Sequence, residues 1–242
     1  MTEQDVENLK TVTRDCITAV TDEGVKACLG DNSKRRLFVI VTDNDFSSNE
    51  PDMEISEGKW YNPHTVSEKI KKEIPSSDII FVPEFATAGE NEKVLLAATK
   101  HDEVVLVTYC ATTCYLGTDC MTRRTEMLLN CLIMSGKVSA LLHYGNPHAV
   151  EPVQHVKRVI FAYNSPASLE PAVDVLAGNI EAKGKLPIEI DLQKSKFKSR
   201  VSRDTRLIFY IVFLQPNRLL YTSPLKKLSS STVSAKVLIL LA

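Results

Sequence analysis

The sequence has few of the features that mark specialised protein classes. Its six cysteines among 242 residues are too sparse for a disulfide scaffold of this length. No apolar run approaches the roughly 18 residues that a transmembrane helix needs, and the polar start at residues 1–10 has no signal-peptide core. A formal net charge of −1 offers no basic excess for nucleic acid. We therefore expect a reduced, cytoplasmic protein with no membrane span and no nucleic-acid partner.

Glycine-rich phosphate loops are missing as well. Such loops need a glycine-rich turn that opens a helix. The two loops where a nucleotide would be sought, residues 42–49 and 84–91, hold at most one glycine each and carry acids that repel phosphate. We expect no nucleotide, and no cofactor of any other kind.

What the chain does contain is an alternation of short apolar runs and amphipathic stretches, at an ordinary 44% apolar and 24% charged residues. Strands are predicted at residues 16–20, 37–41, 78–83, 104–109, 140–142, 159–162 and 184–190. Helices are predicted at residues 2–15, 64–74, 91–100, 123–135 and 165–177. In the helix at 123–135, Gly136 is the predicted C-cap, and the residues predicted to face inward are Met127, Leu128, Cys131, Leu132 and Met134. This alternation predicts an α/β fold: a three-layer α/β/α sandwich with a mainly parallel open sheet.

The composition changes after residue 191. Residues 192–242 carry ten lysines and arginines against one acid, Asp204, and show no helix or strand periodicity. The apolar run at 207–214 is too short to span a bilayer. We expect an α/β domain at 1–191 and an irregular basic tail at 192–242. Two interpretations of the tail stay open: a segment that binds anionic membrane surfaces, or sequence unrelated to the domain.

Four motifs in a fixed order carry a family resemblance. They are Gly145-Asn-Pro147 after a strand, the turn Tyr163-Asn-Ser165 after the next strand, an alanine-containing helix, and Gly184-Lys-Leu-Pro187. In this order the chain resembles the C-terminal α/β-sandwich domain of glycoside hydrolase family 3, in its β-N-acetylhexosaminidase-like branch. Residues 17–24 followed by 37–41 are similar to the family's lead-in, where a β-hairpin precedes the first sheet strand. The resemblance covers residues 10–191.

The resemblance also implies what the chain lacks. In that branch the nucleophilic Asp and the acid/base His lie on a preceding (β/α)8 barrel, which needs roughly 200 residues. Only 36 residues precede Leu37, and the barrel motif Lys-His-Phe-Pro-Gly-His-Gly is not found. No residue of this chain therefore matches the catalytic pair, and we predict no catalytic residue. The implied partner is a family 3 catalytic barrel, in a longer chain or in trans.

The loop Tyr144, Gly145, Asn146 and Pro147 is the predicted substrate-facing segment, turned toward the barrel and its sugar. The alternative is purely structural: a turn that ends a buried strand, with Gly145 and Asn146 accepting unusual dihedral angles.

Other reactive residues are given structural interpretations. The strand-end carboxylates are expected to be solvated loop groups; these are Asp43, Asp45, Glu84, Glu90 and Asp119. A zinc set drawn from Cys110, Cys114, Cys120, His143 and His148 lacks zinc-finger spacing, so no metal is predicted. Cys16, Cys28 and Cys131 are expected to be small core residues.

Two functions follow, from different classes. The first is an accessory domain of a family 3 glycosidase for carbohydrate metabolism, which without its barrel hydrolyses nothing. The second is a non-catalytic module that binds amino sugars or a protein through the loops after Val41, Val82, Tyr109 and Tyr144. Whether the chain is an enzyme stays open on the sequence.

Overall fold

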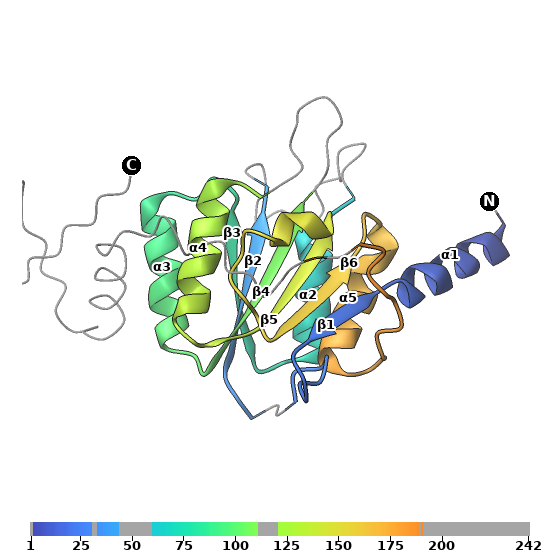
Figure 1. Ribbon diagram of the computed structural model, residues 1–242, viewed down its shortest axis with the longest axis horizontal. Helices are drawn as coiled ribbons and strands as arrows, with labels where there is room; N and C mark the ends of the chain where they lie inside the picture. Colours follow the sequence, from blue (N-terminus) through green and yellow to red (C-terminus); the bar gives the residue numbers. More distant parts are fainter. Residues whose placement is uncertain (1, 31–32, 44–59, 111–120, 189, 191–242) are drawn as a thin grey trace, which may run out of the picture. The chain divides into compact units, whose positions relative to one another are not determined.

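The computed structural model describes residues 2–30, 33–43, 60–110, 121–188 and 190 (Figure 1). All of them belong to one compact unit, Met1–Lys196. The predicted basic tail at 192–242 lies outside the described residues. Among the helices that the structure describes, none combines the length and the apolar character required to cross a membrane.

Six strands form one sheet in the order β1-β6-β5-β4-β2-β3. The strands are β1 (Thr18–Thr21), β2 (Arg36–Thr42), β3 (Ser77–Pro83), β4 (Glu103–Cys110), β5 (Val138–Gly145) and β6 (Arg158–Ala162). β2 to β6 are parallel to one another, and β1 runs antiparallel to β6 at the edge. The mainly parallel sheet predicted from the sequence is confirmed.

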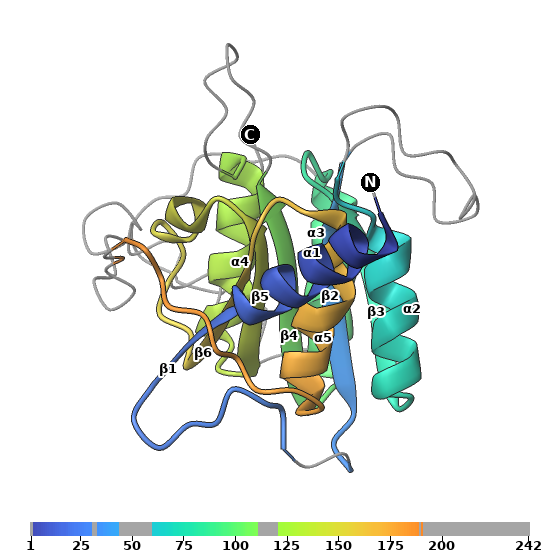
Figure 2. The same cartoon turned by 90° about the vertical axis from the view of Figure 1, so that its right-hand side faces the viewer.

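The helices lie in two layers, one on each face of the sheet (Figures 1 and 2). They are α1 (Glu3–Asp15), α2 (Pro63–Glu73), α3 (Ala88–Thr99), α4 (Arg123–Met134) and α5 (Leu169–Ala177), with short helices η1 (Pro147–Val150) and η2 (Pro166–Ser168). α2 and α5 cover one face, and α3 and α4 cover the other. α1 extends from the sandwich and packs against η2. The predicted α/β/α sandwich is thus observed.

Alternate residues of each central strand fill the two cores. In β2, Phe38 and Ile40 pack under α2 and α5, whereas Leu37 and Val39 pack under α3 and α4. Every residue of this strand is buried. A strand that is covered on both faces has no solvent-facing side, so its sequence is a continuous apolar run.

Capping residues explain where the helices begin. Thr87 accepts a hydrogen bond from the Glu90 amide, and Glu90 accepts one from the Thr87 amide, so the two form a capping box. This box starts α3 at Ala88, three residues before the predicted start at residue 91. α2 begins after Asn62, whose side chain accepts from the amides of His64 and Thr65.

Two strand predictions are wrong. Residues 184–188 and 190 form no strand, because Gly184 donates a single backbone hydrogen bond to Ile17 O and Pro187 has no amide to donate. The expected hairpin before β2 is not formed either, since β1 pairs with β6.

Several inward-facing predictions are also corrected. Met127 and Met134 of α4 are exposed, because its buried face is carried by Thr125, Leu128, Leu129 and Leu132. That spacing leaves residues 127 and 134 on the other side of the helix. Cys16 is exposed and Cys28 and Cys131 are partly buried, so none of the three is a fully buried core residue; all are free thiols.

Candidate functional site

The carboxyl ends of the parallel strands bring the predicted loops to one edge of the sheet. Asp43 follows β2, Glu84 follows β3, and Asn146 follows β5. Loops at the carboxyl ends of parallel strands are the usual place for ligands in open α/β sheets. We refer to this edge, with Asp43, Glu84 and the adjacent aromatic residues, as the carboxyl edge.

Asp43 and Glu84 form an acidic pair at this edge. The Glu84 amide donates to Thr42 O at 2.9 Å, which continues the pairing of β2 and β3 beyond the strands. Burial raises the pKa of Glu84, and the negative charge of Asp43 raises it further. Both side chains are partly buried. Glu84 therefore departs from the expectation of a simple solvated carboxylate, because burial and the negative charge of Asp43 both act on it.

The start of α4 holds the backbone of Glu84 in place. Thr122 and Thr125 both donate their hydroxyls to Glu84 O, at 2.7 and 3.1 Å. Thr122 is also the N-cap of α4, where it accepts from the Thr125 amide. Chemically, the carboxyl oxygens of Asp43 and Glu84 can accept hydrogen bonds from sugar hydroxyls.

An aromatic stack stands beside the acidic pair. The rings of Tyr61 and Tyr109 are parallel, with centroids 4.5 Å apart. Tyr144 packs tilted against Tyr61 at 5.5 Å, and Trp60 meets Tyr61 edge-on at 5.9 Å. Burial raises the pKa of Tyr109, with Glu84 and Asp43 adding to the effect, so this phenol stays protonated and can donate a hydrogen bond. Trp60 and Tyr109 are partly exposed.

The sequence did not identify this stack as a site. Trp60 and Tyr61 precede α2, and Tyr109 ends β4, so nothing in their spacing indicates contact. The weak signal available was position alone: Tyr109 stands at the end of a predicted strand, where ligand loops begin.

The four residues of the predicted substrate-facing loop have different environments. Tyr144 is fully buried and donates its hydroxyl to Leu169 O at 2.8 Å, so its side chain belongs to the core. Gly145 is buried as well, whereas Asn146 and Pro147 are partly exposed. The Asn146 side chain caps η1 by accepting from the His148 amide at 3.1 Å. Contact with substrate stays a prediction, carried by Asn146 and Pro147.

Gly145 has a steric reason for being glycine. Its φ is +106°, and a Cβ at this position would lie 2.1 Å from Cys110 O. The β5 chain therefore passes directly against the end of β4. Only a residue without a side chain fits here.

His143, a residue of the unsupported zinc set, is a core residue. It is fully buried, with Nδ1 2.8 Å from Thr108 Oγ1 and Nε2 2.9 Å from Asn146 O. Because a carbonyl only accepts, Nε2 donates, and Nδ1 accepts from the threonine hydroxyl. Burial lowers the pKa of His143 to about 4, so the ring is neutral at pH 7.

The other described residues that the sequence singled out as possible acids or metal ligands do not contribute to the carboxyl edge. Glu90 caps α3, which lowers its pKa. His148 is exposed and bonds Glu151 at 2.8 Å. Asp45, Asp119, Cys114 and Cys120 lie outside the described residues. Within residues 2–30, 33–43, 60–110, 121–188 and 190, no group of three or more histidines, cysteines and acids could hold a metal ion.

Comparison with known proteins gives matches in structure only. Protein-family models yield no match to this sequence, and neither do curated proteins. A β-N-acetylglucosaminidase of glycoside hydrolase family 3 from Paenibacillus sp. strain FPU-7 is similar over 80% of this chain and 34% of its own, at 20% identity and a TM-score of 0.58.

Further similar structures come from the same family. A fungal multi-domain family 3 β-N-acetylglucosaminidase matches over 79% of this chain and 20% of its own, at 15% identity and a TM-score of 0.54. A β-glucosidase of the family from Bifidobacterium adolescentis matches over 80% of this chain and 30% of its own, at 12% identity and a TM-score of 0.53. The chain thus spans between a fifth and about a third of these enzymes, and it shares their fold over that part.

Proposed function

We propose that this chain is the accessory α/β domain of a family 3 glycoside hydrolase, and that it hydrolyses no glycoside by itself. Its catalytic barrel is supplied by a longer chain or in trans. The observation that carries the proposal is the structural match: 80% of this chain corresponds to only 34% of a family 3 β-N-acetylglucosaminidase. The remainder of that enzyme has no counterpart in these residues.

The carboxyl edge is the surface proposed to face the barrel and its sugar. Asn146 and Pro147 lie partly exposed there, at the end of the same sheet that carries Asp43 and Glu84. Hydroxyl-rich ligands need acceptors and apolar faces together, and this edge offers the acidic pair next to the ring of Tyr109. Following the motif order, we further propose the β-N-acetylhexosaminidase-like branch, with amino sugars as ligands.

The test is hydrolysis of a chromogenic N-acetyl-β-glucosaminide by the purified chain. We expect no hydrolysis above the rate in buffer alone, because a retaining glycosidase needs a nucleophile and an acid/base residue, and the family resemblance places both on the barrel. A rate well above buffer that disappears in Glu84→Gln and persists in Glu170→Gln would overturn the proposal. Glu170 is an exposed carboxylate in the first turn of α5 and serves as the matched control.

A second function, binding of amino sugars without catalysis, is favoured by the aromatic stack. Trp60 is the single tryptophan of the chain and touches Tyr61 within the stack. Titration with N-acetylglucosamine should therefore change the fluorescence of Trp60. The Tyr109→Leu variant should show a weaker response, because it lacks the partly exposed tyrosine ring. An equal change with sorbitol at matched concentration, or no change at all, would count against sugar binding at this edge.

A further inference from the structure

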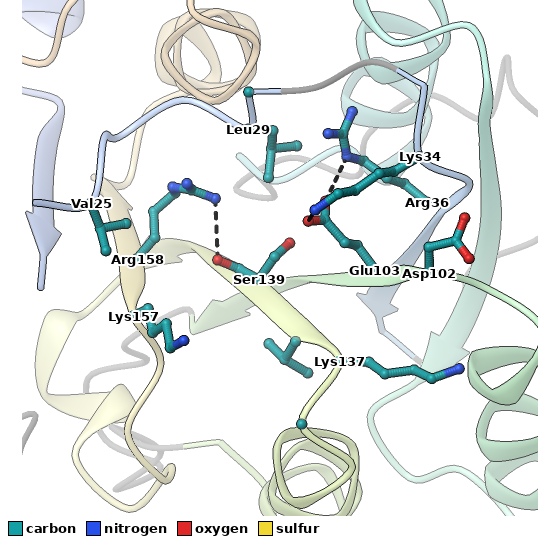
Figure 3. A pocket seen from close by; sticks show the side chains of 13 residues that line it. Val25, Leu29, Lys34, Arg36, Asp102, Glu103, Lys137, Ser139, Lys157 and Arg158 are labelled. Carbon is teal, nitrogen blue, oxygen red and sulfur yellow. Dashed lines mark hydrogen bonds and ion pairs between the residues drawn. The ribbon is translucent and has the colours of Figure 1, made fainter.

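The opposite edge of the sheet holds a pocket of about 480 Å³ (Figure 3). It opens where the central parallel strands begin: Arg36, Glu103, Val138 and Arg158 are the first residues of β2, β4, β5 and β6. The connection from β1 to β2 passes along it and contributes Val25, Leu29 and Gly30. The pocket is therefore formed by the fold itself and lies at the far end of the strands from the carboxyl edge.

The pocket is positively charged although the chain is not. Five cationic side chains line it against two carboxylates, whereas the whole chain has a formal net charge of −1. Glu103 is shared between two cations: Oε1 lies 2.6 Å from Lys34 Nζ, and Oε2 lies 2.9 Å from Arg36 Nε. This arrangement leaves an excess of positive charge on the pocket wall.

Arg158 is a cation of the pocket that has no carboxylate in direct contact among the described residues. Its side chain is partly buried, and its Nε donates to Lys26 O at 2.6 Å. Its Nη1 donates to Ser139 O at 3.2 Å (Figure 3). Both partners are neutral carbonyls, and among the described residues no carboxylate forms an ion pair with this guanidinium. Burial lowers the pKa of Arg158, whereas Cys28 and the carboxylate of Glu103 act in the opposite direction without touching the guanidinium. A partly desolvated guanidinium that is held in a fixed orientation and has no direct carboxylate partner suits an incoming anion.

Lys157 provides a second free cation next to it. Its side chain is exposed at the pocket rim, and its ammonium makes no ion pair or hydrogen bond within the described part of the chain. Lys137, in contrast, donates to the carbonyls that end α3, at 2.7 to 3.1 Å, and is thereby occupied. The cations available to a ligand are thus Arg158 and Lys157.

We propose that this pocket binds a small molecule that carries a phosphate group, with the phosphate held by Arg158 and attracted by the charge of Lys157 at the rim. A guanidinium matches two phosphate oxygens, and an ammonium adds a point charge. The volume lies within the range of about 300–1,000 Å³ typical of small-molecule sites, so it has room for more than the phosphate. The apolar side chains of Val25, Leu29 and Val138 border the remaining space.

The experiment is calorimetric titration of the full chain with inorganic phosphate, glucose 6-phosphate and glucose at constant ionic strength. We expect saturable binding of both phosphates and none of glucose. Equal binding of glucose, or no saturable binding of either phosphate up to millimolar concentration, would overturn the proposal.

Charge variants locate the binding. Arg158→Gln should weaken phosphate binding more than tenfold and Lys157→Gln about fivefold, since the first removes a charge-assisted contact and the second removes a positive charge at the rim. Lys93→Gln is the matched control, because Lys93 is an exposed lysine of α3 outside the pocket. If the Arg158→Gln variant fails to fold, the Lys157→Gln variant tests the proposal instead, because the Lys157 side chain makes no hydrogen bond or ion pair within the described part of the chain. An equal loss of affinity in Lys93→Gln and Lys157→Gln would contradict a defined site. The carboxyl edge is untouched, so this result is independent of the proposed function.

Discussion

At the scale of single residues, two positions near the end of β5 show how the fold uses its sequence. Gly145 lies where a side chain would overlap the end of β4. His143 is buried between the Thr108 hydroxyl and the Asn146 carbonyl, which together satisfy both ring nitrogens. Each residue has chemistry or conformational freedom that suggests a functional role, and each is fully explained by packing.

Substitution of Gly145 by alanine should be strongly destabilising. The added Cβ would lie 2.1 Å from Cys110 O at a φ of +106°, so β4 and β5 must separate locally. We expect the free energy of unfolding to fall by about 3 kcal/mol in urea titration. The control is Gly24→Ala, where φ is +76° but no atom lies within 4 Å; only backbone strain of about 1 kcal/mol is expected there. Equal losses in the two variants would refute the steric explanation.

His143 should make stability depend on pH. Its folded pKa of about 4 lies below its ordinary value of 6.5, so the unfolded chain binds more protons between these values. The contribution to stability is thus fully present above pH 6.5 and is lost as pH falls toward 4. Between pH 7 and pH 5 the loss amounts to about 2 kcal/mol.

The measurement compares urea unfolding of the wild type and His143→Gln at both pH values. The glutamine amide can still donate to Asn146 O but does not titrate. Subtracting the free energies of unfolding of the two proteins removes the effect of other titrating groups. One of these is Glu84, whose raised pKa makes the fold less stable as the pH rises, the opposite of the effect expected for His143. Parallel pH profiles would show that His143 does not carry the effect.

At the scale of elements, local capping fixes where helices start, and ion pairs join them. Lys69 of α2 lies 2.7 Å from Asp174 of α5 and 3.0 Å from Glu73 of its own helix. Both helices cover the same face of the sheet, so this contact ties the layer together. α3 on the other face depends instead on the capping box of Thr87 and Glu90.

Removal of that capping box should cost a measurable part of the stability. Thr87→Ala leaves the Glu90 amide without its acceptor, and we expect the free energy of unfolding to fall by about 1 kcal/mol. Ser67→Ala in α2 is the control: Ser67 bonds His64 O within the helix, where alanine is favourable, so little change is expected. Thermal unfolding of both variants checks this, and an unchanged midpoint in Thr87→Ala would argue against a role for the cap.

At the scale of the molecule, the sandwich has two chemically different ends. The carboxyl edge gathers an acidic pair and aromatic rings, whereas the amino ends of the strands surround a cationic pocket. Both core clusters are built from residues between Ile17 and Ile190. Among the described residues, the side chains that bury the sheet all lie within this unit.

A chain that ends at Lys196 should consequently fold by itself. Its two cores contain more than 30 buried apolar residues, and we expect a single cooperative unfolding transition. Circular dichroism and fluorescence, followed in the same urea titration, should report coincident midpoints. A broad or probe-dependent transition would show that residues beyond 196 are needed for the core.

Much of the fold was predictable because local physics determines it. Strands such as 37–41 are covered on both faces, which makes them continuous apolar runs that are readable without a structure. The predicted strand at 184–190 is wrong: its composition fits a strand, but among its described residues the backbone hydrogen bond to a neighbouring segment is the one from Gly184 to Ile17 O. Strand formation needs a neighbour, and no local pattern supplies that information.

The sequence by itself determined the α/β class, the alternation of its elements and the motif order that resembles family 3. These follow from periodicity, turn residues and capping, which act between residues close in the chain. Only the tertiary structure decided that Asp43 and Glu84 share an edge with Tyr61 and Tyr109, that Tyr144 points into the core, and that Arg158 meets the start of β5. Such contacts join residues far apart in sequence, because parallel strands place their ends together only after the sheet has formed.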